Sequence, residues 1–208
     1  PILMKASAEK ITHTRFDSLL AKTFYKPLGL PALGYLPIER FDTSLIAPTE
    51  NDTAFRHQIL RGYVHDPAAA MLGGVSGNAG LFSNATDVAA IMQMLLNGGA
   101  YGGEKFLEKE TITEFTSQQF AGNRRGLLFD RPEITSSPNA NTCPLASQRS
   151  FGHSGFTGTY VWVDPRYNLI YVFLSNRVYP DAKNDKLAKQ NIRTKIQQVL
   201  YDAVMDKQ

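Results

Sequence analysis

The stretch Phe151-Gly152-His153-Ser154-Gly155-Phe156-Thr157-Gly158-Thr159 leads directly into a run of β-branched and aromatic residues at 159–163. A second such run follows at 169–174, after the polar, proline-bearing segment 164–168. Runs of this composition separated by a short turn segment predict an antiparallel hairpin. The second run is apolar throughout, so we expect both of its faces to be covered.

Helical periodicity flanks the hairpin on both sides. Apolar residues at helical spacing predict an amphipathic helix over about 14–25. Asn84 is a good cap for a second helix, with Asp87 three residues on and Asn97-Gly98-Gly99 as the stop. Leu107, Ile112 and Phe115 predict another short helix, and a long apolar stripe predicts a helix at the end of the chain. Its apolar stripe, expected to pack on the sheet, is Ile192, Ile196, Val199, Leu200, Ala203 and Val204.

Three segments lack periodicity and are expected to be loops. Residues 30–70 form a long irregular stretch that must be pinned to a scaffold, and 131–147 form a polar loop. Residues 73–80 hold four glycines in eight positions, which predicts a tight structured loop. Helices around a short antiparallel sheet give an α+β architecture.

Composition limits the classes of function. The 208 residues are 43% hydrophobic and 20% charged, which fits one globular domain. The net charge of +3 is spread without a basic run, so nucleic acid is an unexpected partner, and no apolar run suits a transmembrane segment. Cys143 is the single cysteine, and the four histidines show no metal-ligand spacing, so we expect no metal and no cofactor. The chain starts at Pro1, and we expect it to be a piece of something longer.

The opening stretch resembles the third conserved box of the penicillin-recognising serine hydrolases, where Lys/His-Ser/Thr-Gly lies on a sheet edge. The resemblance covers nearly the whole chain. Its other landmarks are Pro27-Leu28-Gly29-Leu30, Ala47-Pro48-Thr49-Glu50, Gly62-Tyr63-Val64-His65-Asp66, Ala79-Gly80-Leu81-Phe82-Ser83, Tyr160-Val161-Trp162-Val163-Asp164-Pro165 and Leu174-Ser175-Asn176-Arg177. It is closest to the class C β-lactamase-like modules that follow a family 3 glycoside hydrolase module in some Bacteroidetes proteins.

The resemblance implies a fold and a place of action. Residues 1–208 would be a single, incomplete domain, the C-terminal portion of the α+β β-lactamase/transpeptidase-like fold. An antiparallel sheet flanked by helices would draw about three strands from this chain, with the last helix on one face and helices with the glycine-rich loop opposite. A role in cell-wall turnover implies a periplasmic or otherwise extracytoplasmic location.

The resemblance also implies roles for the residues of the box. The backbone N–H of Phe156 would stabilise the oxyanion, and His153 would face the cleft as a proton-transfer or anion-orienting group. Ser154 would offer its hydroxyl to the substrate, Gly155 would allow close approach of the substrate backbone, and Thr157 would join the substrate-binding residues. A nucleophile elbow of the α/β-hydrolase type is a poorer reading, because Phe156 replaces its closing glycine.

Residues outside the box are further candidates for substrate contact. His65, Asp66 and Asn78 flank the glycine-rich loop, where substrate contact and local hydrogen bonding are equally good interpretations. Asn176 follows the last strand, near the place where class C enzymes recognise a substrate carboxylate. Asp181 is an acid there, which argues against β-lactam binding.

The nucleophile motif of the family is absent in any convincing form. Ser7-Ala8-Glu9-Lys10 spells Ser-x-x-Lys but lies before the expected helix at 14–25, in the wrong chain order, and we interpret it as coincidence. Ser76-Gly77-Asn78 spells Ser-x-Asn, yet its neighbours match the glycine-rich landmark. The preceding N-terminal part of the same protein would therefore supply the catalytic Ser and Lys.

The predicted function is part of a serine acyl hydrolase or transferase acting on amide or ester bonds. It would be of the β-lactamase, D-Ala-D-Ala carboxypeptidase or esterase type, with a small-molecule or peptidoglycan-peptide substrate. The chain alone would be inactive. The alternative is a non-catalytic peptidoglycan-binding or docking module of a larger wall-turnover protein.

Overall fold

A computed structural model describes residues 1–135, 137 and 140–206. The chain divides into two compact units, Pro1–Val88 with Ser175–Asn184 and Ala89–Leu174 with the C-terminal segment from Asp185. Each unit is described by itself.

The first unit consists of short elements. Its elements are α1 (Ile2–Thr12), α2 (Phe16–Leu20), the π-helical turn η1 (Ala21–Tyr25), the 3₁₀ turns η2 (Pro37–Glu39) and η3 (Thr43–Leu45), β1 (Pro48–Asp52), β2 (Gln58–Arg61) and α3 (Pro67–Met71). The helix expected at 14–25 is present as α2 and η1. The segment expected to be irregular contains η2, η3, α3 and the antiparallel β1–β2 hairpin. These elements were missed because they are too short to show a period.

The helix α4 (Ala85–Leu96) begins and ends as expected. The Asn84 side chain accepts a hydrogen bond from the backbone N–H of Asp87 at 2.8 Å. The Asp87 carboxylate does not complete a capping box. It accepts hydrogen bonds instead from the backbone N–H groups of Ala32 and Leu33, at 2.7 and 3.0 Å, and so ties the loop after η1 to the start of α4. Gly98 and Gly99 end the helix with φ of 70° and 100°.

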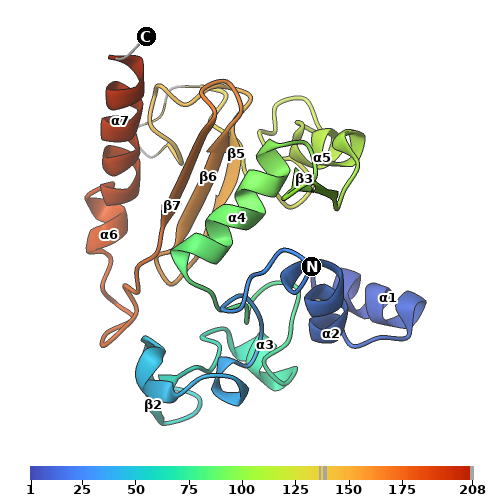
Figure 1. Cartoon of the computed structure of the whole chain (residues 1–208). Helices are drawn as coiled ribbons and strands as arrows, with labels where there is room; N and C mark the ends of the chain where they lie inside the picture. Colours follow the sequence, from blue (N-terminus) through green and yellow to red (C-terminus); the bar gives the residue numbers. More distant parts are fainter. Residues whose placement is uncertain (136, 138–139, 207–208) are drawn as a thin grey trace. The chain divides into compact units, whose positions relative to one another are not determined.

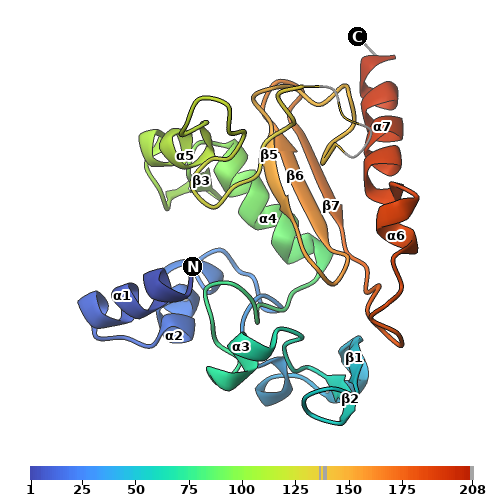
Figure 2. The same ribbon diagram turned by 180° about the vertical axis from the view of Figure 1, so that it is seen from behind.

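The second unit holds the main sheet. After α4 come β3 (Ala100–Tyr101), β4 (Glu104–Lys105) and α5 (Lys109–Thr116), then β5 (Phe151–Ser154), β6 (Tyr160–Asp164), β7 (Leu169–Phe173), α6 (Lys186–Lys189) and α7 (Ile192–Met205). The strands β5, β6 and β7 form an antiparallel sheet in that order. Figures 1 and 2 show α7 on the β7 side of this sheet and α5 on the β5 side. The predicted α+β architecture, hairpin and final helix are confirmed.

The core of this unit lies between β6, β7 and α7. Trp162 is 2% exposed, stacks on Tyr160 with ring centroids 5.4 Å apart, and donates its indole N–H to the Ser150 hydroxyl at 2.9 Å. Tyr201 of α7 is 1% exposed, and its hydroxyl donates to the Asp164 carboxylate at 2.6 Å. The α7 helix is therefore attached to the sheet by a buried hydrogen bond as well as by apolar packing.

The stripe predicted to bury α7 was wrong at three positions. Ile196 and Val199 are 38% and 66% exposed and Ala203 is exposed as well, whereas Gln197 is completely buried. The Gln197 amide oxygen accepts from the Cys143 backbone N–H and from the Tyr160 hydroxyl, at 2.8 and 3.2 Å. The helix is rotated so that these polar partners meet, which a periodicity of apolar residues cannot indicate.

The expectation for the second strand of the hairpin was also wrong. Tyr171 is buried, but the other residues of β7 are half-buried, and Leu174 just beyond it is exposed. In the part of the chain that the structure describes, β7 pairs with β6. Among the described strands β7 lies at the edge of the sheet, so most of its apolar side chains are only partly covered by the described residues.

Candidate functional site

The predicted box occupies β5 and the turn that follows it. Ser154 faces Tyr160 and His153 faces Val161 in the antiparallel register with β6. A Cβ atom at Gly152 would lie 2.4 Å from the Trp162 ring and 2.1 Å from the Val161 carbonyl oxygen. Glycine at this position therefore lets β5 lie against the buried indole of the neighbouring strand.

The two side chains of the box point to opposite faces of the sheet, because successive residues of a strand alternate. Ser154 lies on the face of its partner Tyr160, while His153 lies on the face of Val161. Both side chains are exposed. The His153 Nδ1 atom lies 2.8 Å from the Ser154 carbonyl oxygen, a contact within the same strand.

A tight turn holds Phe156 and Thr157 at the end of the strand. The Gly155 backbone N–H donates to the Thr159 carbonyl at 2.8 Å, and the Gly158 N–H donates to the Gly155 carbonyl at 3.1 Å. A Cβ at Gly155 would meet the Thr159 hydroxyl at 2.1 Å, so this position needs glycine to close the turn. The Phe156 side chain is 65% exposed at the tip.

The outer edge of β5 is covered at one point. Asp130 and Gly152 exchange backbone hydrogen bonds of 2.8 and 2.9 Å. Asp130 is buried and lies 3.1 Å from the Arg124 guanidinium. The segment around Asp130 therefore pairs with the start of β5, ahead of the His-Ser-Gly residues.

His65 belongs to the first unit and lies in an ion cluster on the β1–β2 hairpin. Its Nδ1 lies 2.9 Å from Glu50 Oε1. Arg56 donates to Glu50 at 3.0 Å and to the His65 carbonyl oxygen at 3.1 Å, and its Nε donates to Asp52 at 2.7 Å. The Arg56 hydrogen bond holds the pKa of Asp52 well below its ordinary value. His65 thus helps to hold the hairpin.

Asp66 and Asn78, which the sequence placed in two separate landmarks, are brought together by a hydrogen bond. The Asp66 side chain caps α3 by accepting the Ala69 backbone N–H at 2.7 Å, and it also accepts the Asn78 amide at 3.2 Å. The buried Ser76 hydroxyl donates to the Asn78 amide oxygen at 2.7 Å. Of the two interpretations left open, local hydrogen bonding is observed directly.

Asn176 joins the segment Ser175–Asn184 to β1 in the same unit. Its amide N–H donates to the carbonyl oxygen of Thr49 at 2.9 Å and also to that of Pro48. Its side-chain oxygen accepts the Val178 backbone N–H at 3.2 Å. These contacts explain an asparagine at this position without a ligand.

The Ser-x-x-Lys match at residues 7–10 and the Ser-x-Asn match at residues 76–78 show no sign of a catalytic arrangement. Ser7 and Lys10 lie inside α1, not before a helix, and both are exposed. Ser76 is 1% exposed and bonded to Asn78. Among the described residues, no group of His, Cys, Asp and Glu could hold a metal ion, and none of the described helices is long and apolar enough to cross a membrane.

The comparisons with known proteins agree on one family. The beta-lactamase family model matches residues 2–194. The chain belongs to the beta-lactamase family. A Salmonella agona protein named "Putative D-alanyl-D-alanine carboxypeptidase" is 36% identical over 191 residues, covering 86% of this chain and 44% of its own length. The chain thus spans less than half the length of this relative.

Solved structures of the beta-lactamase family confirm the fold. A beta-lactamase from Mycobacterium bovis has a TM-score of 0.63 at 21% identity, covering 96% of this chain and 60% of that one. A penicillin-binding protein homologue from Caulobacter crescentus has a TM-score of 0.54 at 20% identity, covering 81% of this chain and 48% of that one. Matches at this identity concern the arrangement of the chain alone.

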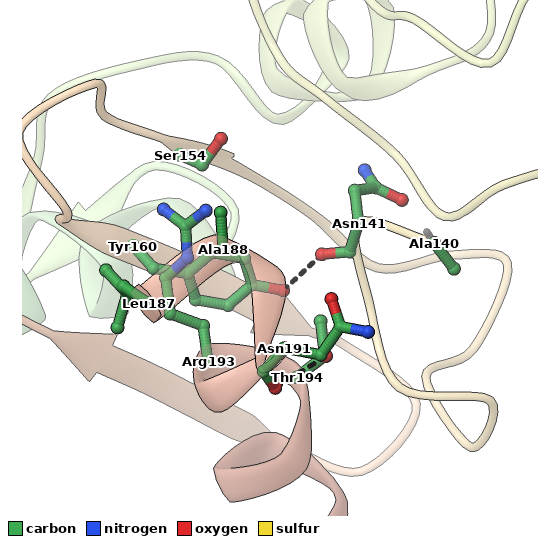
Figure 3. A pocket seen from close by; sticks show the side chains of 9 residues that line it. All are labelled: Ala140, Asn141, Ser154, Tyr160, Leu187, Ala188, Asn191, Arg193 and Thr194. Carbon is green, nitrogen blue, oxygen red and sulfur yellow. Dashed lines mark hydrogen bonds between the residues drawn. The ribbon is translucent and has the colours of Figure 1, made fainter. Parts of the chain in front are cut away.

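In this member of the beta-lactamase family, Ser154 also lines a cavity of about 280 Å³ beside α7 (Figure 3). Its wall includes Arg193, Asn141 and Tyr160. The sequence analysis missed Arg193. The available signal was a basic residue in the first turn of a helix, where the helix dipole disfavours positive charge.

Proposed function

We propose that the chain is part of a serine acyl hydrolase or transferase that acts on cell-wall peptides, of the D-Ala-D-Ala carboxypeptidase type. The observation that carries the proposal is the 36% identity over 191 residues to a relative with that name, together with an intact His-Ser-Gly box on a strand at the edge of the described sheet. Membership of the beta-lactamase family makes acyl transfer the expected reaction class.

In this proposal the box supplies stabilising and orienting groups. The backbone N–H of Phe156 would donate to the oxyanion, and His153 would transfer a proton or orient an anionic group. Ser154 and Thr157 would offer hydroxyls to the substrate. The turn closed by Gly155 and Gly158 supports these roles, because it fixes the backbone from which the N–H would act.

The nucleophilic Ser and its Lys would come from the rest of the protein. The relatives are more than twice as long as the matched region, so there is chain to supply them. The Ser7 and Ser76 motifs are poor substitutes, since Ser7 is exposed on α1 and the Ser76 hydroxyl is bonded to Asn78. The same additional chain would pair with β7 and cover its half-buried residues. Cell-wall substrates would place the protein outside the cytoplasm.

The test is covalent labelling of the full-length protein with a fluorescent penicillin or a fluorophosphonate, read by intact-mass spectrometry. This chain alone is the control. We expect an adduct on the full-length protein only. An adduct on this chain would show that the nucleophile lies within it, and the absence of any adduct on either would favour a peptidoglycan-binding module without catalysis.

A further inference from the structure

One stretch of chain lies along the outer edge of β5 and stops beside the His-Ser-Gly box. Residues 126–133, here called the edge strap, form an antiparallel bridge with Gly152 through Asp130. The described backbone hydrogen bonds between the edge strap and β5, of 2.8 and 2.9 Å, are both at this bridge. In antiparallel register the preceding residue, Phe129, comes beside His153. The chain then turns away, because the Phe129 carbonyl oxygen accepts a hydrogen bond at 3.1 Å from the N–H three residues earlier.

Beyond the edge strap, β5 has a second position that faces the same edge. Gly152 points its backbone groups away from β6 and toward Asp130. Outward positions of a strand recur at every second residue, so the backbone N–H and carbonyl of Ser154 face this edge as well. The described hydrogen bonds of the edge strap do not reach Ser154. An extended peptide can therefore add to β5 at Ser154 but not at Gly152, where the edge strap already holds both backbone groups.

Side-chain contacts fix the edge strap in place. Arg124 donates to the Asp130 carboxylate and to the Arg131 carbonyl oxygen, both at 3.1 Å. Asp130 is 5% exposed, so this charge-assisted contact is shielded from water. The Phe129 ring packs edge-on against the buried Phe151 ring of β5, with centroids 5.3 Å apart. The edge strap is thus held by a cation and a ring contact as well as by its bridge, and it resists displacement by an incoming peptide.

We propose that the edge strap limits the substrate to about two residues beyond the bond that is cleaved, so that the protein removes residues from chain ends only. The scissile carbonyl would lie at the Phe156 N–H, which rests on the proposed function. A peptide antiparallel to β5 runs from there toward Gly152, with its next two residues beside Gly155 and Ser154 and the third against the edge strap. Antiparallel pairing is the mode that the edge strap itself uses. The edge strap then determines specificity, because it occupies the hydrogen-bonding groups that a longer leaving segment would need.

The experiment uses the full-length protein and a series of N-acetylated peptides that end in D-Ala-D-Ala or carry one to four glycines after it. Cleavage between the two alanines releases leaving segments of increasing length. We expect kcat/KM to drop about 100-fold or more when the leaving segment grows from two residues to three, because the third residue meets the edge strap. Matched peptides carry the same glycines at the N-terminal end instead and should differ from the parent peptide by less than about 3-fold.

Two arginines adjacent in the sequence separate the edge strap from its surroundings. Arg124→Gln removes the cation that holds Asp130, and it should reduce the drop to about 10-fold and accelerate hydrogen exchange of the Gly152 amide about 10-fold or more. Arg125→Gln changes an exposed guanidinium 3.9 Å from the Asp130 carboxylate and should alter the drop by less than about 2-fold. Asp130→Pro deletes the bridging N–H itself and gives the same comparison if Arg124→Gln leaves the Gly152 amide protected.

Three results would overturn the role of the edge strap. They are a gradual decline without a drop at the third residue, a larger loss for the N-terminal extensions, and a drop that persists once the Gly152 amide exchanges rapidly. If no peptide is cleaved, the proposed function fails, and the same series is titrated calorimetrically. Exclusion by the edge strap does not depend on acylation, so affinity should show the same drop, and equal affinity along the series would overturn it.

Discussion

The two histidines predicted to contact substrate occupy opposite surroundings. His153 is exposed near the end of β5 and makes a contact with the backbone of its own strand. His65 is half-buried against Glu50, and its carbonyl oxygen is held by Arg56. The difference shows that one residue type in two matching motifs can have opposite surroundings, exposed on a strand in one case and held in an ion cluster in the other.

The largest effect in this comparison is expected at Arg56, the cation of the cluster that holds His65. Arg56→Met removes the partner of two nearly buried carboxylates, Glu50 at 7% and Asp52 at 6% exposure. Loss of the cation that is shared by these two buried carboxylates should lower the free energy of unfolding by about 3 kcal/mol. Urea denaturation followed by circular dichroism measures this loss.

A matched control and the pH dependence sharpen that prediction. Lys105→Met breaks the exposed Lys105–Glu108 pair and should cost less than about 1 kcal/mol. Because the pKa of Asp52 is lowered in the folded state, its contribution to stability is complete above pH of about 4 and is lost as the pH falls further. Wild type should therefore lose more stability than Asp52→Asn between pH 6 and pH 3. Equal losses would contradict the role given to this pair.

The second prediction is a slower acylation with an unchanged free energy of unfolding. His153→Ala in the full-length protein should slow acylation by a fluorophosphonate about 100-fold, as expected for loss of a proton-transfer group. Its side chain is exposed, so the free energy of unfolding should change by less than about 0.5 kcal/mol. Stopped-flow labelling and urea denaturation give the two values.

Rescue separates a chemical role of His153 from a positional one. His153→Lys restores the other residue type that the box accommodates and should recover part of the lost rate. If His153→Ala instead lowers stability and leaves the labelling rate intact, His153 has a structural role and takes no part in acylation.

The smallest effect is expected at Asn78. Asn78→Ala deprives the buried Ser76 hydroxyl of its acceptor and Asp66 of a donor, which should cost about 1 kcal/mol. Thermal unfolding measures the change. Asn51→Ala, at an exposed position of β1, is the control and should have little effect. A large loss of acylation with unchanged stability would instead place Asn78 in contact with substrate.

Much of the fold was predictable because its signals are local. The α4 helix has its cap and stop within a few residues of its ends, and both are observed. The β6–β7 hairpin follows from composition and a turn segment. The β1–β2 hairpin was missed, since its strands hold polar residues whose partners are ionic, and no apolar alternation marks them.

The sequence predicted which residues belong to the candidate site but not how they are arranged in space. The box His153-Ser154-Gly155-Phe156 could be recognised as a motif, but alternation along β5 sends His153 and Ser154 to opposite faces. Asn176 could be placed after the last strand, whereas its bonds to the backbone of β1 join residues more than 120 positions apart. Such contacts have no local signal.

The sequence by itself determined the strands, the helix caps, the glycines of the turn and the family. These depend on backbone conformation and on motifs that are contiguous in the chain. Tertiary structure alone decided which face of α7 is buried, because Gln197 and Tyr201 find Tyr160 and Asp164 on the sheet. It also decided which polar residues, such as Asn78 and Asn176, hydrogen-bond to other parts of the chain. Packing alone places Arg193 and Ser154 around the same cavity. Hydrogen bonds and ion pairs select partners by distance in space, and that distance is set only when the elements pack.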